Sequence, residues 1–335
     1  MTQTHTLPSL LVIASLALFH SGAATANPTQ HTPTQQVDAL EAVFGVHPGF
    51  RRGQAKGVCA TGQFTGTEAG AALSTTTAFN GEPHAVLARF SVAGGNPGGT
   101  DQSRGTRGLA LSMTLPDREQ WQMGNISAPL YFVAHPDQFA PFLAVRTPDP
   151  DTGSINQAAL AAFNEAHPET LKQSEWLATQ PLHGSFAGNT YWGVNAFRLT
   201  NADGKQQYVR WSFIPQQDID VPGESTLATL GDNFLESDLA ERLKDGPVRF
   251  DFYLQLATED DSLVDPTTVW PDSNPRILAG ELAITASSAG KGGSCDQVMF
   301  NPLVLPDGIR ASDDPVLHAR PAAYGVSFGR RMSED

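Results

Sequence analysis

An arginine and a tyrosine near the C-terminus have types and spacing that could hold a metal. Arg320 and Tyr324 are four positions apart, and Arg331 follows seven positions after the tyrosine. On a helix all three side chains share one face, and a guanidinium beside a phenol favours the phenolate because the cation stabilises its charge. A phenolate is a hard anionic ligand suited to ferric iron. Taken alone, the spacing is more typical of a surface or core tyrosine with an incidental arginine one turn away.

Three blocks of sequence add to this pattern and together resemble the catalase family. Residues 300–324 resemble the family's proximal segment, F-D-P…P-x-G-I-E…S-x-D…R-x-x-x-Y. Residues 89–110 resemble R-F-S…D…R-x-x-R-G-x-A, and residues 265–271 resemble D-P-T-x-V-W-P. The resemblance implies a single α+β domain over residues 27–335, built as a catalase-like antiparallel β-barrel with inserted helices. It also implies haem b, buried between the barrel and the C-terminal helix.

The resemblance gives five residues of this chain a role toward haem. Tyr324 takes the position of the axial iron ligand, and Arg320 takes that of the group that holds the ligand ionised. Arg51, Arg89 and Arg331 match positions that pair with the haem propionates, which suits the fork of donors on arginine.

One position departs from the family pattern. The family's distal stretch reads R-x-x-H-A-K-G, whereas residues 51–57 read RRGQAKG, so Gln54 stands where a histidine shuttles the peroxide proton. Peroxide heterolysis needs a group that takes up and returns a proton near working pH, and an amide can only hydrogen-bond. General acid–base help is typically worth about 10²- to 10⁴-fold. We therefore expect weak but measurable turnover, and we expect His47 to be a turn residue rather than a replacement base.

Three further residues are expected around the distal side. Ser91 matches the serine that hydrogen-bonds the distal histidine, so here we expect it to orient Gln54. Asn125 matches the distal asparagine, although G-N-I-S-A-P here is one residue longer than the family's G-N-N-T-P. Phe139 keeps the spacing of the phenylalanine stacked over the haem, and its alternative role is as a core residue of a helix over 136–146.

Apolar periodicity and turn residues predict the elements that must position these side chains. A capping box at residues 32–35 (TPTQ) opens a short amphipathic helix. We expect strands over 58–65, 85–93, 108–115, 130–134, 191–200, 206–215 and 248–256, and helices over 156–167, 169–180, 234–244 and 315–331.

The N-terminus carries features of an export signal. Residues 9–19 form an apolar run, and an A-x-A pattern ends at residue 26, so residues 1–26 are expected to be a signal peptide and the protein to be periplasmic or secreted. A buried first helix is the alternative, and residues 1–26 contain no Lys or Arg. Export would allow a disulfide between Cys59 and Cys295, but a buried thiol on a strand is the favoured interpretation of Cys59.

The composition of the chain argues against several classes of binding partner. The 335 residues include 35 acidic and 21 basic side chains, for a net charge of −14, which argues against nucleic acid. No apolar run reaches the roughly 18 residues needed to cross a bilayer. Two cysteines are too few for a cysteine-ligated zinc or iron–sulfur site. The expected partners are therefore peroxide and a small organic electron donor.

Chain length and motifs together resemble the short, exported catalase-related peroxidases. This resemblance implies a haem-dependent peroxidase that uses hydrogen peroxide or organic peroxides, has little catalase activity and is impaired by Gln54. A haem-binding or haem- or peroxide-sensing protein without turnover is the alternative, and an engineered change at Gln54 in an active enzyme is a third. A monomer or homodimer is expected, since the chain lacks the arm that interlocks catalase tetramers.

Overall fold

The computed structural model describes residues 1–2 and 32–334, and residues His31–Asp335 cluster into one unit. All but the first two residues of the expected signal peptide, 1–26, therefore lie outside the described residues. No helix in the described ranges is long and apolar enough to cross a membrane.

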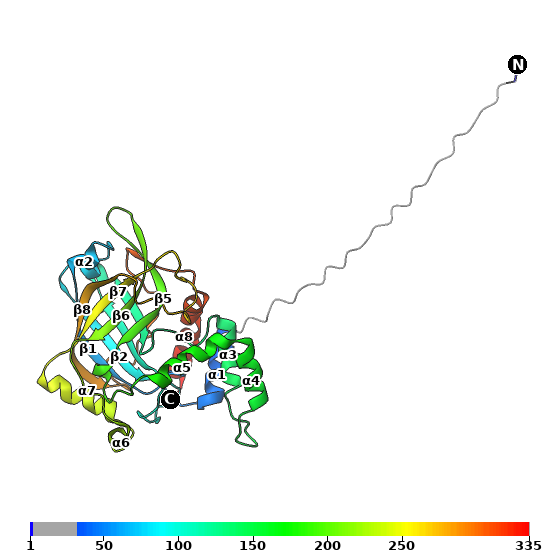
Figure 1. Ribbon diagram of the computed structural model, residues 1–335, viewed down its shortest axis with the longest axis horizontal. Helices are drawn as coiled ribbons and strands as arrows, with labels where there is room; N and C mark the ends of the chain where they lie inside the picture. The colour runs from blue at the N-terminus through cyan, green and yellow to red at the C-terminus, as the bar shows by residue number, and fades with distance from the viewer. Residues whose placement is uncertain (3–31, 335) are drawn as a thin grey trace. The chain divides into compact units, whose positions relative to one another are not determined.

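Antiparallel strands form a closed barrel, which confirms the fold class (Figure 1). The strands of the barrel are β1 (Gly57–Gly66), β2 (Pro83–Val92), β3 (Arg107–Thr114), β4 (Gln120–Ile126), β5 (Tyr191–Thr200), β6 (Gln206–Pro215), β7 (Val248–Leu256) and β8 (Arg276–Ala289). They pair in the order β4-β3-β2-β1-β8-β7-β6-β5, and a bridge between Ile126 and Trp192 closes β4 onto β5. A short strand, β9 (Ile309–Ala311), extends the sheet beyond β5.

The barrel interior is filled by aromatic side chains. Phe64 packs edge-on against Phe252 with ring centroids 5.4 Å apart, and Trp121 meets Trp211 at 5.5 Å. These rings are 0–3% exposed. These side chains fill the interior of the eight-stranded barrel, so a ligand the size of haem has to bind outside it.

One predicted strand is wrong, and the strands β4, β8 and β9 were missed. Residues 130–134 form no strand, because Leu130 and Val133 are buried by loop packing while the backbone of Tyr131 donates to the carbonyl of Pro266. Of the missed strands, β4 and β8 carry mostly polar or small residues on their outer faces, which weakens the apolar signal that marks a strand, and β9 is only three residues long.

Most helices gather on one side of the barrel, whereas α2 and α7 contact β8 elsewhere on its surface (Figure 1). The helices are α1 (Pro33–Phe44), α2 (Glu68–Ala71), α3 (Phe139–Ala144), α4 (Gln157–Ala166), α5 (Lys172–Thr179), α6 (Glu224–Leu227), α7 (Phe234–Asp245) and α8 (Pro315–Ser333). The expected capping box opens α1: the Oγ1 of Thr32 accepts from the backbone of Gln35, whose side chain accepts in return from the backbone of Thr32. Helix α8 begins at the cap Asp314 and runs through Pro321.

Ion pairs tie α1 to the C-terminal helix and to the segment before β1. Arg330 on α8 contacts Glu41 and Asp38 of α1, each at 2.6 Å. Arg52 contacts the same Glu41 at 2.6 Å and also pairs with Glu334. These contacts fix α8 and residues 50–57 relative to each other, and both segments carry predicted site residues.

Cys59 and Cys295 form a disulfide, so the buried-thiol interpretation of Cys59 is wrong. Their Cα atoms are 5.3 Å apart although 236 positions separate them in the chain, and both side chains are 0% exposed. The chain that follows β8 returns over β1, and this non-local packing brings the two cysteines together.

Candidate functional site

The predicted pair at the C-terminus forms as expected on α8. The Nε of Arg320 donates a hydrogen bond to the phenol oxygen of Tyr324 at 3.0 Å. A second nitrogen of Arg320 donates to the Oδ1 of Asn195 at 2.8 Å, and the amide of Asn195 donates to Asp314 at 2.6 Å. Asp314 in turn accepts from backbone amides at the start of α8. A charged donor is thus held against the tyrosine oxygen by a continuous network, the arrangement that stabilises negative charge on that oxygen.

The electrostatic setting keeps Arg320 a cation. Burial lowers the pKa of Arg320, but Tyr324, Tyr131 and Asp314 raise it, and the net shift is upward. Burial also raises the pKa of Tyr131, and nearby Tyr324 adds to that shift, so Tyr131 stays a neutral phenol. A Cβ on Gly124 would lie 2.6 Å from a terminal nitrogen of Arg320. Glycine at that position on β4 therefore gives the guanidinium its room.

Sequence reasoning missed Asn195, which holds Arg320 in place. Asn195 is buried within β5, in the register shift between Gly193 and Phe197. A bulge of this kind re-aims a side chain relative to the regular ladder. A Cβ on Gly193 would lie 2.2 Å from the indole nitrogen of Trp211, so a glycine is needed there too. The one sequence signal was an amide within the otherwise apolar run YWGVNAF.

Gln54 and Ser91 meet on the outer face of the sheet. The hydroxyl of Ser91 donates to the Oε1 of Gln54 at 3.0 Å, as expected for a residue that orients the amide. Gly108 on β3 lies against both: a Cβ there would be 2.5 Å from the Ser91 hydroxyl and 2.7 Å from the Gln54 oxygen. Gln54 itself has a φ of 52°, in the left-handed region. Backbone and neighbours together define the direction of this amide.

The structure does not bring Asn125 to this pair. Asn125 is 2% exposed inside the barrel, where its amide donates to the carbonyl of Leu109 at 2.9 Å and its oxygen accepts from the indole of Trp211 at 2.8 Å. The outer-face residue at this level is Ile126, which pairs with Gly108. The extra residue in this stretch explains the correction, because a shift of one position moves a strand side chain to the opposite face.

The three predicted propionate-binding arginines gather beside a single carboxylate. Arg331 contacts Asp296 at 3.1 Å and also donates to the carbonyl of Val298. Arg51 donates to that same carbonyl at 3.0 Å. Arg89 donates to a backbone carbonyl in the segment that carries Arg51, at 3.0 Å.

This cluster is short of negative charge. Burial lowers the pKa of Arg51 to about 9, and the positive charges of Arg89 and Arg331 lower it too. Burial likewise lowers the pKa of Arg89 to about 10, helped by Arg331. The Nε of Arg331 is buried and finds no hydrogen-bond partner among the described residues. Bringing carboxylates to the cluster would relieve this repulsion, so it is built to bind an anion.

Phe139 lies in a patch of half-buried aromatic rings. Its ring centroid is 5.6 Å from that of Phe132, which lies 4.8 Å from Phe142 and 4.4 Å from Tyr131. The helix that carries Phe139 is shorter than expected: a 3-10 turn over Pro136–Gln138 precedes α3. Half-buried rings of this kind suit a flat aromatic ligand as well as a core role.

Comparisons with known proteins agree with the architecture. The family model described as Catalase matches residues 49–334. The chain is 36% identical over 320 residues to a catalase-related peroxidase of Synechococcus elongatus, covering 96% of this chain and 94% of that protein. It is 35% identical over 305 residues to a catalase-related peroxidase of Mycolicibacterium paratuberculosis, covering 91% of this chain and 96% of that protein.

Solved structures give the same fold. A fungal catalase and catalase A from Saccharomyces cerevisiae superpose with a TM-score of 0.74, at 23% and 22% identity. Each comparison covers 84% of this chain, which spans 59% and 61% of the two catalase chains. At this level of identity the likeness supports the fold alone.

Proposed function

Because the chain belongs to the catalase family, we propose that it is a haem-dependent peroxidase that oxidises small organic donors with hydrogen peroxide or organic peroxides and has little catalase activity. The observation that carries the proposal is the bond from Arg320 to the oxygen of Tyr324. It would give haem iron one oxygen ligand from a half-buried face of α8. The match to two catalase-related peroxidases over more than nine-tenths of each chain supports the peroxidase class.

The donor set fits haem better than a metal chelated by the protein alone. Among the described residues there is no group of three or more His, Cys, Asp or Glu that could hold a metal ion. A porphyrin brings its own four nitrogens and needs one further ligand, which Tyr324 would supply. Arg51, Arg89 and Arg331 would hold the two propionates, and Phe139 would face the ring. Haem b, when bound, supplies the iron that accepts electrons from donors and passes them to peroxide.

The distal residues determine how protons move. A histidine could take a proton from one peroxide oxygen and return it to the other, whereas the amide of Gln54 has no pKa in the working range. Its oxygen is already engaged by Ser91, which leaves the amide nitrogen to donate to a bound peroxide. Proton transfer then falls to water or to the peroxide itself, so slow turnover is expected. This same feature favours the second candidate function, a haem-binding or peroxide-sensing protein without turnover.

Peroxide turnover by the haem-loaded protein tests the proposal. We expect slow oxidation of a phenolic donor with hydrogen peroxide or cumene hydroperoxide, and little oxygen release from hydrogen peroxide alone. The Ser91→Ala variant should lower the rate further, because the Gln54 amide loses the hydroxyl that orients it. Fast oxygen release would contradict the peroxidase assignment. Haem binding with no donor oxidation in the wild type or in Gln54→His would favour the sensing alternative.

We also propose that the protein is exported and begins near residue 27. The disulfide between Cys59 and Cys295 supports this, because such bonds persist in oxidising compartments and are rare in the cytosol. N-terminal sequencing of the protein isolated after expression of the full chain in a Gram-negative bacterium would test it. A mature chain that starts at Met1 would overturn the proposal.

A further inference from the structure

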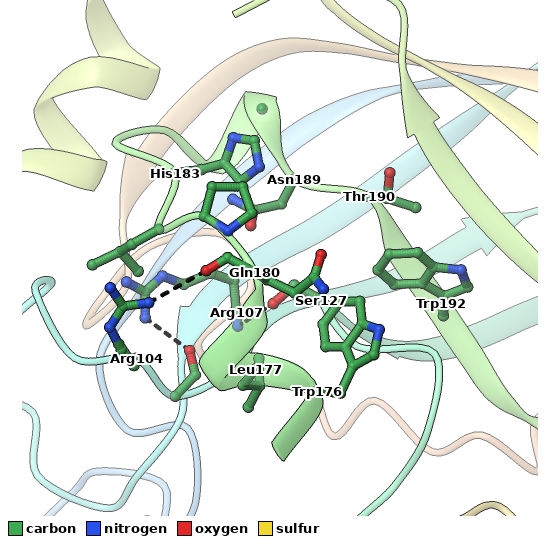
Figure 2. A pocket seen from close by; sticks show the side chains of 14 residues that line it. Arg104, Arg107, Ser127, Trp176, Leu177, Gln180, His183, Asn189, Thr190 and Trp192 are labelled. Atoms are coloured by element: carbon green, nitrogen blue, oxygen red, sulfur yellow. Dashed lines mark hydrogen bonds between the residues drawn. The ribbon is translucent and has the colours of Figure 1, made fainter. Parts of the chain in front are cut away.

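A cavity of about 270 Å³ lies apart from the residues described so far (Figure 2). Its walls come from the start of β3, from α5 and from the segment that leads into β5. Two indoles form one corner: Trp176 and Trp192 meet edge to face with ring centroids 5.7 Å apart. Pockets for drug-sized ligands span roughly 300–1,000 Å³. This cavity is therefore suited to a single substituted ring, and its indole corner offers that ring an aromatic face.

Two arginines, Arg104 and Arg107, line the cavity. Arg107 is 2% exposed and donates to the backbone carbonyls of Gly105 and Asp101, while its Nε has no hydrogen-bond partner among the described residues. The carboxylate of Asp101 is used elsewhere, by Lys56 at 2.8 Å and by a backbone amide. Burial lowers the pKa of Arg107, and the charge of nearby Asp101 opposes that shift. The hydrogen bonds of Arg107 go to neutral carbonyls, so a ligand carboxylate can add a charge-assisted bond to this guanidinium.

A histidine supplies a neutral polar group on the same cavity. The Nδ1 of His183 is buried and has no hydrogen-bond partner among the described residues. Burial lowers the pKa of His183, so the ring is neutral at neutral pH and can accept a hydrogen bond from a hydroxyl group. Figure 2 shows His183 at the top of the cavity, Trp176 at the bottom and Trp192 at the right, with Arg104 at the left.

The cavity adjoins the strand segments that carry the distal pair. Arg107 directly precedes Gly108, the residue against which the Ser91 hydroxyl and the Gln54 oxygen lie. On the neighbouring strand, Ile126 pairs both with Gly108 and with Trp192 of the cavity wall. The cavity wall and the distal pair therefore share neighbouring positions on β3, β4 and β5.

We propose that this cavity binds the organic electron donor and that the donor is a small aromatic acid, a single ring that carries a carboxylate and a hydroxyl group. The carboxylate binds Arg107, the ring packs in the corner of Trp176 and Trp192, and the hydroxyl group donates to His183. The inference rests on the proposed peroxidase function for its biological meaning, while the binding itself does not depend on turnover.

Calorimetry of the haem-loaded protein with 4-hydroxybenzoate tests the binding. We expect saturable binding that weakens about tenfold in Arg107→Gln, through loss of a charge-assisted hydrogen bond, and in Trp176→Leu. The neutral analogue 4-hydroxybenzamide should bind the wild type about tenfold more weakly than the acid. Tyr253→Leu, an aromatic-to-leucine change on β7 away from the cavity, should leave the affinity unchanged. Absence of saturable binding, or equal affinity in wild type and Trp176→Leu, would overturn the inference even if Arg107→Gln fails to fold.

Steady-state kinetics separate this inference from the peroxidase proposal. In Trp176→Leu the KM for 4-hydroxybenzoate should rise about tenfold while the dependence on peroxide concentration stays the same. Donor oxidation at an unchanged KM would overturn the cavity inference and leave the peroxidase proposal standing. Calorimetric binding that follows the expected variant pattern, with no oxidation of any donor, would support the cavity and overturn only the peroxidase proposal.

Discussion

Arg320 and Tyr324 lie one helical turn apart on α8, and the guanidinium Nε donates to the phenol oxygen at 3.0 Å. The two residues are close in sequence, but the residues that hold Arg320 in position are not. The other end of the guanidinium is bound by Asn195 on β5, and a glycine on β4 leaves it room. The electrostatic environment of the tyrosine oxygen therefore depends on α8 and on two strands of the barrel.

Removing the Asn195 amide should weaken this arrangement. Asn195→Ala removes the partner of one carboxylate oxygen of Asp314 and of one nitrogen of Arg320. Such a loss costs about 1–3 kcal/mol per unsatisfied group. We expect a lower free energy of unfolding in urea and a shifted haem absorption spectrum. Asn125→Ala is the matched control, because it removes a buried asparagine in the barrel interior: it should destabilise the protein but leave the spectrum unchanged. Equal spectral shifts in both variants would contradict the role given to Asn195.

Restoring a base at position 54 should speed peroxide turnover. Gln54→His supplies a group that can accept and return a proton, worth about 10²- to 10⁴-fold in rate. Histidine is also among the residues that tolerate the left-handed backbone found here. Stopped-flow measurement of peroxide consumption compares wild type, Gln54→His and Gln54→Leu. Wild type as fast as the histidine variant would show that the distal account is wrong.

The disulfide should help to retain the cofactor. Cys295 begins the segment whose carbonyls accept from Arg51 and Arg331, so cutting its link to Cys59 loosens two of the three clustered arginines. The double variant Cys59→Ser/Cys295→Ser should lose about 2–5 kcal/mol of stability and release haem faster. Haem transfer to an excess of apomyoglobin measures the release rate. A reducing agent should reproduce the effect in wild type and have none in the double variant.

Acid should loosen the contact between α1 and α8. Burial raises the pKa of Glu41, but hydrogen bonds from Arg52 and Arg330 lower it, and the net shift is below the ordinary value of 4.5. The bond to Arg52 also lowers the pKa of Glu334. Because the folded-state pKa values are depressed, this stabilisation is present above the unfolded value and is lost as pH falls through the folded values.

Melting curves between pH 3 and 6 measure the loss. The melting temperature of Glu41→Gln should be lower than that of wild type near pH 6, and the two should converge at the acid end. A constant difference across the range would contradict the assignment.

Local patterns made much of the fold predictable. The capping box of α1, the strand pair on either side of the turn at residues 201–204 and the alternation along β7 all depend on residues close in sequence, and all three formed as predicted. The Arg320–Tyr324 pair belongs to the same class, because helix periodicity alone puts the two side chains on one face.

The predictions that were wrong or missing involve contacts between residues far apart in the sequence. Asn125 was expected beside the distal pair because it matches the family's distal asparagine, and only the strand pairing with β3 shows that it faces the barrel interior. Asn195 reaches Arg320 across 125 positions through a bulge in β5, and the disulfide closes across 236. The periodicity of helices and strands extends over only a few residues, so it does not reveal contacts between residues this far apart in the sequence.

Haem binding by the wild type and by Tyr324→Phe tests the central claim most directly. We predict that the wild type binds one haem and shows the absorption and paramagnetic resonance spectra of tyrosinate-ligated ferric iron. Tyr324→Phe should lose that signature and bind haem more weakly, whereas Tyr131→Phe, which changes the neighbouring phenol, should keep it. An unchanged spectrum in Tyr324→Phe, or a wild-type protein that binds no haem, would contradict the account.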